Sequence, residues 1–466
     1  MKAVRSWFRW EIWLQLALAA ATLALAAAGA GGVLNLAFLP LAAAVALILY
    51  LRSPTRDYVS FCLWIWMLAP LVRRLADWSS GFNPLSLIIV APLAVSLLAI
   101  GRANRKSFWS YAPFTAIIIV YAYGALLGIF QGQPIPALYT LATLVSPVIF
   151  GCYILTYADR SREIAGTMLR TFIYGTFVLS LYAIDQYFNL RPWDAYWLTA
   201  SEFSSAGLPI PQMFRLFSTL NSPGHFAVLL LVGLLAMFSS SSRLRWITPP
   251  LALVSLALTL VRSAWGGLAI GLLVLLVVGQ GFQRLRYVLI GLVATILALP
   301  LLSYEPISEV FFGRLASIVN LAEDNSYNAR LSFSDTILSQ VDSLVLGNGL
   351  GISGLGTKLG GENSDAMRVF DNGVLDLFYN FGLMALIIVF SLAAMIYTAI
   401  KNGSFDDYSR VSAAIAVGVL SQIVFSNALV GFGGMCIFPF VAIVVSWKVS
   451  APRRQTAFPV QRAFAR

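Results

Sequence analysis

Long apolar runs, separated by short polar connections, follow one another along almost the whole chain. Each run has about 17–25 residues, the length that crosses the hydrocarbon core of a bilayer as an α-helix. The runs predict about 14 spans, near residues 12–29, 33–51, 58–75, 84–100, 111–130, 138–157, 164–184, 221–239, 247–261, 264–279, 287–303, 373–399, 411–429 and 434–450. A transmembrane β-barrel would instead show short segments of alternating polarity. The pattern therefore predicts an all-α polytopic membrane protein with about 12–14 transmembrane helices.

The composition agrees with this class. Of the 466 residues, 59% are hydrophobic and 11% are charged, whereas a soluble domain has about 25% charged residues. Too few charges remain to cover a water-facing surface, which excludes a soluble globular protein. The cysteines Cys62, Cys152 and Cys436 lie inside apolar runs and are expected to be small buried hydrophobic residues. A single histidine excludes a multi-histidine metal site, and we expect neither a metal nor a cofactor.

The positions of lysine and arginine predict the orientation of the spans. With a cytoplasmic N-terminus, every second connection carries the basic residues that the positive-inside rule expects. This set comprises Lys2, Arg5, Arg9, Arg52, Arg56, Arg102, Arg105, Lys106, Arg160, Arg162, Arg243, Arg245, Arg284, Arg286, Lys401 and Arg410, together with the basic residues of the C-terminal tail. Both termini are therefore predicted to be cytoplasmic. The formal net charge of +11 is then mainly a topology signal, and we expect no nucleic-acid partner.

Nine basic residues fall on the predicted exoplasmic side, namely Arg73, Arg74, Arg191, Arg215, Arg262, Arg314, Arg330, Lys358 and Arg368. We expect Arg73 and Arg74 to reach lipid phosphates. Two exoplasmic segments are longer than the other connections. Residues 185–220 are rich in aromatic side chains, and residues 304–372 are too long for a simple connector. The longer segment is expected to form an amphipathic helix over 328–341 that ends before Gly347-Asn-Gly349-Leu-Gly351.

Three places combine polar residues at the predicted exoplasmic face, where a membrane enzyme would have its site. In the first, Arg215 precedes a helix start formed by Asn221, Ser222 and Pro223, with His225 in the first turn. Asn221 or Ser222 can cap this helix, and Pro223 suits its first turn. The positive end of the helix, beside Arg215, would favour a phosphate group. The alternative is an ordinary capped helix start in which His225 only packs.

In the second place, two apolar runs meet at Arg262 with almost no connection between them, in the sequence Leu258-Thr259-Leu-Val-Arg262-Ser-Ala-Trp265. A buried arginine is costly without an anionic partner, and no acidic residue lies nearby in the sequence. The partner of Arg262 is therefore either a distant residue or a ligand. The planar guanidinium group suits a phosphate, which it can bind through two parallel hydrogen bonds.

The third place is the entry from the long exoplasmic segment into the span near 373–399. It contains Arg368, Asp371 and Asn372, and Asp376 follows about one turn further along. Asp371 can either cap the helix or accept a proton from a hydroxyl group at the membrane face. Asp376 lies within an apolar helix and is expected to face the interior of the bundle.

In this order, the three places resemble motifs of the O-antigen ligase and Wzy-type polysaccharide polymerase superfamily. An arginine before an Asn-Pro-Asn-like helix start is similar to Arg215-Leu-Phe-Ser-Thr-Leu-Asn221-Ser-Pro223-Gly, and a Leu-Thr-x-Ser-Arg-x-x-Trp-like junction is similar to residues 258–265. An Asn-x-x-Arg helix and a Gly-x-Gly-x-Gly turn resemble Asn328-Ala-Arg330 and residues 347–351. A His-Asn-x-x-Leu helix start with a later Gly-Leu pair resembles Asp371-Asn372-Gly-Val-Leu375 and Gly382-Leu383.

The resemblance covers about residues 210–390 and implies a GT-C-like glycosyltransferase. It would polymerise undecaprenyl-diphosphate-linked oligosaccharide units into O-antigen, capsule or exopolysaccharide, by a metal-independent inverting transfer. Arg215 and Arg262 match the arginines that hold the diphosphate in this family. Asp371 stands where ligases have histidine, which favours a polymerase, and it is the expected proton acceptor. The residues expected to contact the diphosphate or the glycan are Arg215, Arg262, Asn221, His225, Arg314, Arg330, Arg368 and Asn372.

The same resemblance implies a multi-pass protein of the bacterial inner membrane whose site faces the periplasm. Expected partners are the glycan donor, a glycan or lipid A core acceptor, membrane lipids, a chain-length regulator and a flippase. The chain then divides into N-terminal spans (1–210), core spans with the arginine motifs (211–303), a periplasmic segment (304–372), C-terminal spans (373–450) and a cytoplasmic tail (451–466). Two alternatives stay open: a ligase that transfers the glycan to lipid A core or another acceptor, and a lipid-linked glycan flippase.

Overall fold

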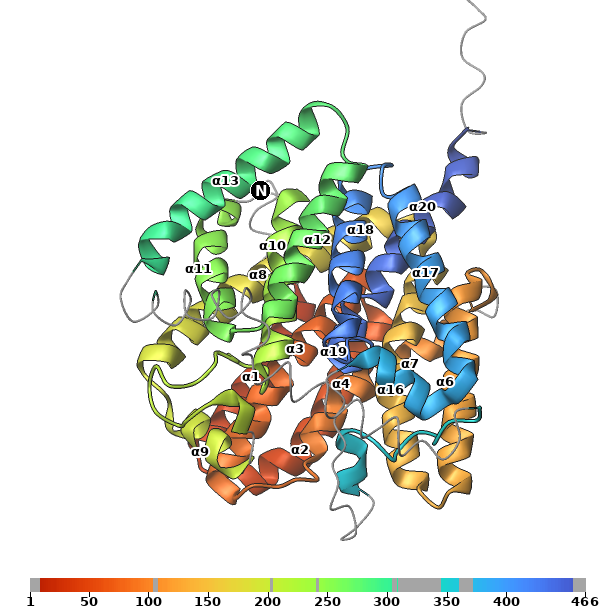
Figure 1. Ribbon diagram of the computed structural model, residues 1–466. Coiled ribbons are helices and arrows are strands. Elements are labelled where there is room, and N and C mark those ends of the chain that lie inside the picture. Colours follow the sequence, from red (N-terminus) through yellow and green to blue (C-terminus); the bar gives the residue numbers. More distant parts are fainter. Residues whose placement is uncertain are drawn as a thin grey trace, which may run out of the picture.

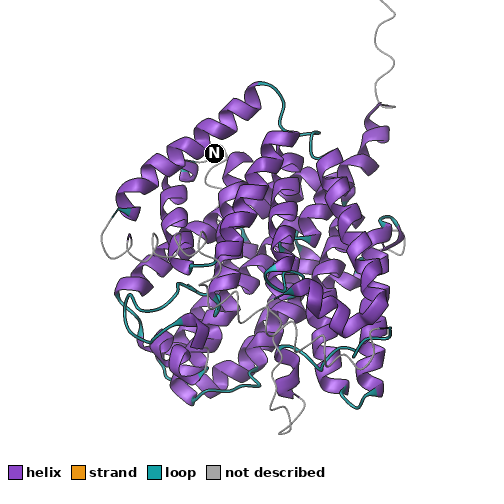
Figure 2. Ribbon diagram, viewed as in Figure 1, coloured by secondary structure: helices purple, strands orange, loops and turns teal. Residues whose placement is uncertain are grey.

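The computed structural model describes residues 9–103, 108–201, 204–239, 243–303, 308, 345–359 and 372–455. Over these ranges every regular element is a helix, and one isolated antiparallel bridge pairs Gly207 with Phe214 (Figure 2). The predicted all-α class is confirmed for this part of the chain. The helix expected over 328–341 lies outside the described residues.

The helices of the first half follow one another with short connections. They are α1 (Trp10–Ala27), α2 (Gly31–Arg52), α3 (Thr55–Ser80), η2 (Leu87–Val90), α4 (Ala91–Leu97), η3 (Leu98–Gly101), α6 (Ala112–Phe130), α7 (Pro134–Thr156), η4 (Ala158–Arg160), α8 (Ser161–Phe188), α9 (Pro192–Ala200) and η5 (Ser204–Ala206). Here α denotes an α-helix and η a 3-10 helix.

The second half continues in the same way on either side of the long segment. Its helices are α10 (Pro223–Ala236), η6 (Met237–Ser239), α11 (Leu244–Thr259), α12 (Arg262–Val278), α13 (Phe282–Leu302), η8 (Leu355–Leu359), α16 (Gly373–Phe381), η9 (Gly382–Met384), α17 (Ala385–Asn402), α18 (Asp407–Leu420), η10 (Ser421–Val424), α19 (Gly431–Met435) and α20 (Phe438–Gln455).

Eight helical segments of the described chain are long and apolar enough to cross a membrane, which supports a multi-pass membrane protein. They are Trp10–Ala27, Gly31–Arg52, Thr55–Ser80, Ala112–Phe130, Pro134–Thr156, Ala158–Phe188, Phe282–Pro300 and Gly373–Asn402. The other predicted spans overlap shorter helices, of which α10, α11 and α12 are examples. The sequence therefore located the helices well, but it overestimated the lengths of α10 and α18, whose α-helical parts end at Ala236 and Leu420.

Helix α10 lies in the interior of the bundle, where it contacts α8, α11, α12 and α18 (Figure 1). Its residues from Phe226 to Ala236 are all buried, as expected for a helix that is apolar on every side. Helix α13 lies along one edge and exposes large apolar side chains such as Leu289 and Leu292. Such a surface suits contact with lipid rather than water.

Helices α12 and α18 pack unusually closely because glycines line their contact. A Cβ atom on Gly267 would lie 2.6 Å from the carbonyl oxygen of Gly418, and one on Gly418 would lie 2.7 Å from that of Gly267. Only glycine leaves room for this approach, which is common where helices pack in membranes. The contact fixes the start of α12, where Arg262 lies, against the C-terminal half of α18.

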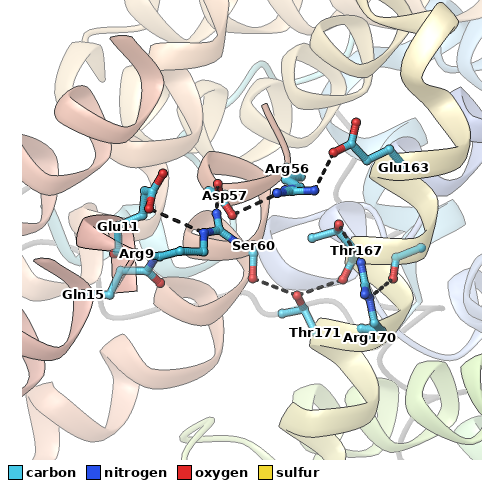
Figure 3. A network of polar contacts seen from close by, with 11 residues as sticks. Arg9, Glu11, Gln15, Arg56, Asp57, Ser60, Glu163, Thr167, Arg170 and Thr171 are labelled. Atoms are coloured by element: carbon cyan, nitrogen blue, oxygen red, sulfur yellow. Dashed lines mark hydrogen bonds and ion pairs between the residues drawn. The ribbon is translucent and has the colours of Figure 1, made fainter. Parts of the chain in front are cut away.

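Basic residues from connections predicted to be cytoplasmic meet at one end of the bundle. Arg9 donates a hydrogen bond of 2.5 Å to Asp57, and Arg56 donates one of 2.9 Å to Glu163, so that α1, α3 and α8 are joined (Figure 3). Ser60 and Thr171 hydrogen-bond beside them at 2.9 Å. The cation–π contacts of Arg102 with Tyr50 and of Arg162 with Tyr408 join further connections of the same set. These contacts agree with the predicted alternation of the loops, and the identity of the cytoplasmic side stays a prediction.

Candidate functional site

The segment between α9 and α10 is irregular and begins with a tight reversal. Gly207 pairs with Phe214, and the backbone N–H of Arg215 donates a 2.7 Å hydrogen bond to the carbonyl of Ala206. Three residues of this segment, Gln212, Ser218 and Asn221, have positive φ angles of 66°, 51° and 56°. Left-handed conformations of this kind cost non-glycine residues about 1–2 kcal/mol each, so tertiary contacts must hold them.

A buried ion pair supplies such contacts to Ser218. The guanidinium group of Arg74 in α3 donates through Nη1 to Asp194 of α9 and through Nη2 to the Ser218 carbonyl, each at 2.5 Å. The side chains of Arg74 and Asp194 are both 0% exposed. Gln186 of α8 accepts a hydrogen bond from the Ser218 N–H at 3.0 Å, and the Ser218 hydroxyl donates to the Leu179 carbonyl at 2.7 Å. Every polar group of Ser218 is therefore bonded, and the backbone of this residue is fixed.

The expectation that Arg73 and Arg74 reach lipid phosphates is wrong for both residues. Arg74 is buried against Asp194, as described above. Arg73 lies within 3.3 Å of Asp77 and donates a 2.8 Å hydrogen bond to the carbonyl of Asn83. Both arginines find their anionic partners inside the protein because α9 and the turn after α3 fold back over them.

The structure brings the first two predicted places into direct contact. Arg215 donates through Nε to the Thr259 carbonyl at 2.9 Å, and the backbone N–H of Leu216 donates to the Leu258 carbonyl at 3.2 Å. Leu260 ends α11 with a positive φ of 57°. Among the described non-glycine residues, positive φ angles occur only in this junction and in the segment before α10. The backbone strain is thus concentrated at the two arginine motifs.

Arg262 begins α12 directly after the strained junction. Val261 lies between the two helices and donates its backbone N–H to the Thr259 hydroxyl at 3.3 Å. The indole of Trp265 reaches back to the Leu256 carbonyl at 3.1 Å and ties the first turn of α12 to α11. The Arg262 side chain is half-buried. Both arginines therefore lie at the junction between α11 and α12. Arg215 contacts it through a side-chain hydrogen bond, and Arg262 is the residue that begins α12.

The start of α10 differs from the predicted cap. Ser222 is the N-cap residue, but its side chain makes no capping hydrogen bond, and neither does that of Asn221. The Asn221 carbonyl oxygen Oδ1 is buried without a hydrogen-bond partner in the described structure. Pro223 occupies the first turn, as expected. His225 is exposed even though the rest of the helix beyond it is buried, so the N-terminal turn of α10 opens to the surroundings.

The third predicted place is described from Asn372 onward. The Asn372 side chain caps α16 by accepting hydrogen bonds from the N–H groups of Val374 (3.0 Å) and Leu375 (3.1 Å). These two bonds make Asn372 the N-cap of α16, the role that the sequence offers as one alternative for Asp371. The remaining predicted site residues, Asp371, Arg314, Arg330 and Arg368, lie outside the described residues.

Asp376 of α16 is the centre of a polar cluster that the sequence analysis does not predict. Asp376 accepts hydrogen bonds from Ser353 (3.2 Å) and Asn380 (2.8 Å) through Oδ1 and from Asn427 (2.5 Å) through Oδ2. Asn380 lies four residues after Asp376 on the same face of the helix, which is a signal that the sequence offered. The other two partners come from the glycine-rich turn and from the connection between α18 and α19. Asp376 thus faces protein, as expected for an acid in an apolar helix.

The glycine-rich turn is fixed against α6, α7 and α16. Gly349 has a φ of 74°, and a Cβ atom there would lie 2.5 Å from the backbone nitrogen of Gly128. Its N–H donates to the Asn380 carbonyl at 2.9 Å, and the N–H of Leu350 donates to Gly124 at 2.8 Å. These contacts fix the turn in place, and residues shortly after it include Ser353 of the Asp376 cluster.

Comparison with known proteins gives no assignment. No family model matches the chain, and no curated protein matches it.

Proposed function

We propose that the protein is a GT-C-like glycosyltransferase that polymerises undecaprenyl-diphosphate-linked oligosaccharide units at the periplasmic face of the inner membrane. The observation that supports this most is the hydrogen bond from Arg215 to the Thr259 carbonyl, because it gathers both arginine motifs at one helix junction. Two arginines at the junction that leads into the positive N-terminal end of α12 suit a diphosphate. The same pair of arginines is what the sequence resemblance implied for donor binding.

The proposed reaction is a single inverting displacement. A hydroxyl oxygen of the acceptor glycan attacks the anomeric carbon of the donor, and the bond from that carbon to the phosphate oxygen breaks. The carrier diphosphate leaves with added negative charge, which Arg215 and Arg262 would stabilise. Asp371 is the proposed acceptor of the hydroxyl proton. No metal is required, since the guanidinium groups supply the positive charge.

Ligase and flippase are the competing proposals. A ligase would perform the same displacement with lipid A core as the acceptor. A flippase would move the carrier without cleaving it, and its polar residues should then extend through the bilayer. Arg215 and Arg262 instead meet at one helix junction, which favours chemistry at one face.

The test is a transfer assay in vitro. Purified protein in nanodiscs is incubated, without added metal, with carrier-linked oligosaccharide extracted from the host, and the glycans are separated on a gel. We expect a ladder of longer glycans from the wild type and from Arg160→Ala, whose side chain is 55% exposed at the predicted cytoplasmic end. We expect no ladder from Arg215→Ala or Arg262→Ala.

Three other outcomes would contradict the proposal. Transfer only after addition of lipid A core would indicate a ligase. Movement of labelled carrier across liposomes without transfer to any acceptor would indicate a flippase. An unchanged ladder in both arginine variants would show that these residues do not hold the diphosphate.

A further inference from the structure

The cluster around Asp376 has one buried side and one accessible side. Ser353 and Asn380 are buried, whereas Asp376 and Asn427 are half-buried. Asn380 donates to both the backbone and the side chain of Asp376. The single hydroxyl proton of Ser353 is shared between Oδ1 of Asp376 and Oδ1 of Asn380, each at 3.2 Å. The buried side is therefore fully engaged in internal hydrogen bonds. The accessible edge is the pair of Asp376 and Asn427.

This accessible edge retains hydrogen-bonding capacity. A carboxylate oxygen can accept about two hydrogen bonds. Oδ1 of Asp376 accepts two, while Oδ2 accepts only the one from Asn427 among the described residues. Asn427 uses one of its two N–H groups in that bond. All three described partners of the carboxylate are neutral, so its charge is balanced by hydrogen bonds rather than by an ion pair.

The connection between α18 and α19 (residues 421–430) links this edge to α12. A Cβ atom on Gly267, in the second turn of α12, would lie 3.2 Å from Cγ of Gln422. At the other end, a Cβ atom on Gly373, the first residue of α16, would lie 2.8 Å from the Ser426 carbonyl. Asn427 follows directly and reaches Asp376. One short connection thus packs against the second turn of α12 and the first turn of α16.

A second contact ties the same connection to the Arg215 segment. The hydroxyl of Thr219 donates to the Met67 carbonyl of α3 at 2.7 Å. Gly431, the first residue of α19, directly follows the connection. A Cβ atom on Gly431 would lie 3.4 Å from the indole ring of Trp66, the residue before Met67 in α3. Adjacent residues of α3 therefore hold both segments, and the Asp376 edge belongs to the same region of the bundle as the arginine motifs.

We infer that Asp376 and Asn427 form the subsite that binds the acceptor glycan, holding neighbouring hydroxyl groups of one sugar. The carboxylate accepts a hydrogen bond from one hydroxyl, and the amide donates to or accepts from the next. This recognition is the usual use of paired carboxylate and amide groups, because sugar hydroxyls both donate and accept. The inference rests on the proposed function and adds to it the place and the class of the acceptor. Asp376 is a binding residue in it, whereas Ser353 and Asn380 stabilise the fold on the buried side of the cluster.

The test measures binding of the acceptor apart from transfer. The probe is the oligosaccharide unit released from its carrier by mild acid, titrated into the full-length protein in nanodiscs and followed by saturation-transfer NMR. A hydrogen bond to a charged group contributes about 1.5–3 kcal/mol, so Asp376→Asn should raise the Kd of the free oligosaccharide about 10- to 100-fold. Asn427→Ala should raise this Kd by a smaller factor.

Two controls separate binding from folding and from donor chemistry. Asn380→Ala disrupts the same cluster from its buried side, and it should lower the melting temperature while changing the Kd less than about 3-fold. Arg262→Ala should bind the free oligosaccharide as the wild type does while failing to transfer. Equal increases in Kd for Asn380→Ala and Asp376→Asn would show that the cluster is only structural and would overturn the inference.

The proposed function and this inference fail in different ways. If the wild type transfers glycan but Asp376→Asn binds the free oligosaccharide with unchanged Kd, the subsite is wrong and the function stands. If the wild type shows no saturation transfer to the oligosaccharide at millimolar concentration, the subsite is likewise wrong. If the wild type binds the oligosaccharide through Asp376 but transfers it to nothing, the subsite stands and the transferase proposal fails.

Discussion

The buried pair of Arg74 and Asp194 should dominate the stability of the segment that presents Arg215. Asp194 accepts hydrogen bonds from Arg74 (2.5 Å), Tyr182 (2.7 Å) and Gln186 (2.9 Å). The substitution Asp194→Asn keeps the shape of the side chain and removes its charge, so the guanidinium of Arg74 stays buried without a counter-charge. Loss of one partner of a buried ion pair costs about 3–5 kcal/mol. We expect the free energy of unfolding to fall by this amount.

The assay is unfolding in mixed micelles titrated with SDS, followed by the fluorescence of the 12 tryptophans. The matched control is Asp185→Asn, because Asp185 also pairs with an arginine close to α9 but both side chains are exposed, at 36% for Asp185 and 45% for Arg191. That variant should unfold at nearly the wild-type midpoint. The double variant Arg74→Met/Asp194→Asn should recover part of the loss, because no unpaired charge is left buried.

Two results would refute this reasoning. If Asp194→Asn and Asp185→Asn have the same midpoint, the buried pair does not stabilise the fold. If the double variant loses the sum of the stabilities lost by Arg74→Met alone and by Asp194→Asn alone, Arg74 and Asp194 act independently and are not a pair. A loss of stability in Asp194→Asn that leaves glycan transfer intact in the folded fraction would show that Ser218 holds its position without the pair.

Three further variants test other parts of the structure. Gly349→Ala forces a side chain into the backbone of α6 at a φ of 74°, so we expect the thermal unfolding temperature to fall and transfer to be lost, as read by light scattering and the gel assay. Asn372→Ala should cost about 1 kcal/mol of unfolding free energy because it removes the cap of α16, whereas Asn372→Ser should restore it. Glu163→Gln should change the SDS midpoint little and leave the transfer ladder intact, because its pair with Arg56 is largely exposed.

The sequence predicted what depends on neighbours along the chain. The apolar runs located the helices, Pro223 marked the start of α10, and the glycines at 347–351 marked a turn with positive φ angles. These features follow from local preferences, since a proline without an N–H or a residue without a side chain permits only a few conformations. The lengths of α10 and α18 were predicted less well, because packing against neighbours decides where such helices end.

The sequence did not predict contacts between distant segments. Arg74 and Asp194 are separated by 120 positions, and Asp376 and Asn427 by 51. In the sequence Arg74 resembles an arginine that reaches the lipid headgroups, because nothing near it is acidic except Asp77. The ion pair between Arg74 and Asp194 forms only because α9 folds over α3. The polar partner of such an arginine is therefore best sought among acids on other segments at the same end of the bundle.

The distribution of strain gives the clearest physical reason to place function at the two arginine motifs. A chain that needed only to reverse direction at Ser218 or Leu260 could use glycine, as it does at positions 347, 349 and 351. At Ser218 glycine would lose the hydroxyl bond to Leu179, which helps to fix the backbone beside Arg215. Strain of about 1–2 kcal/mol per residue persists only where surrounding contacts over-determine the conformation. The buried ion pair, the Gln186 bond and the Thr259 bond supply those contacts, and all of them act on the segment that sets where Arg215 lies relative to Arg262.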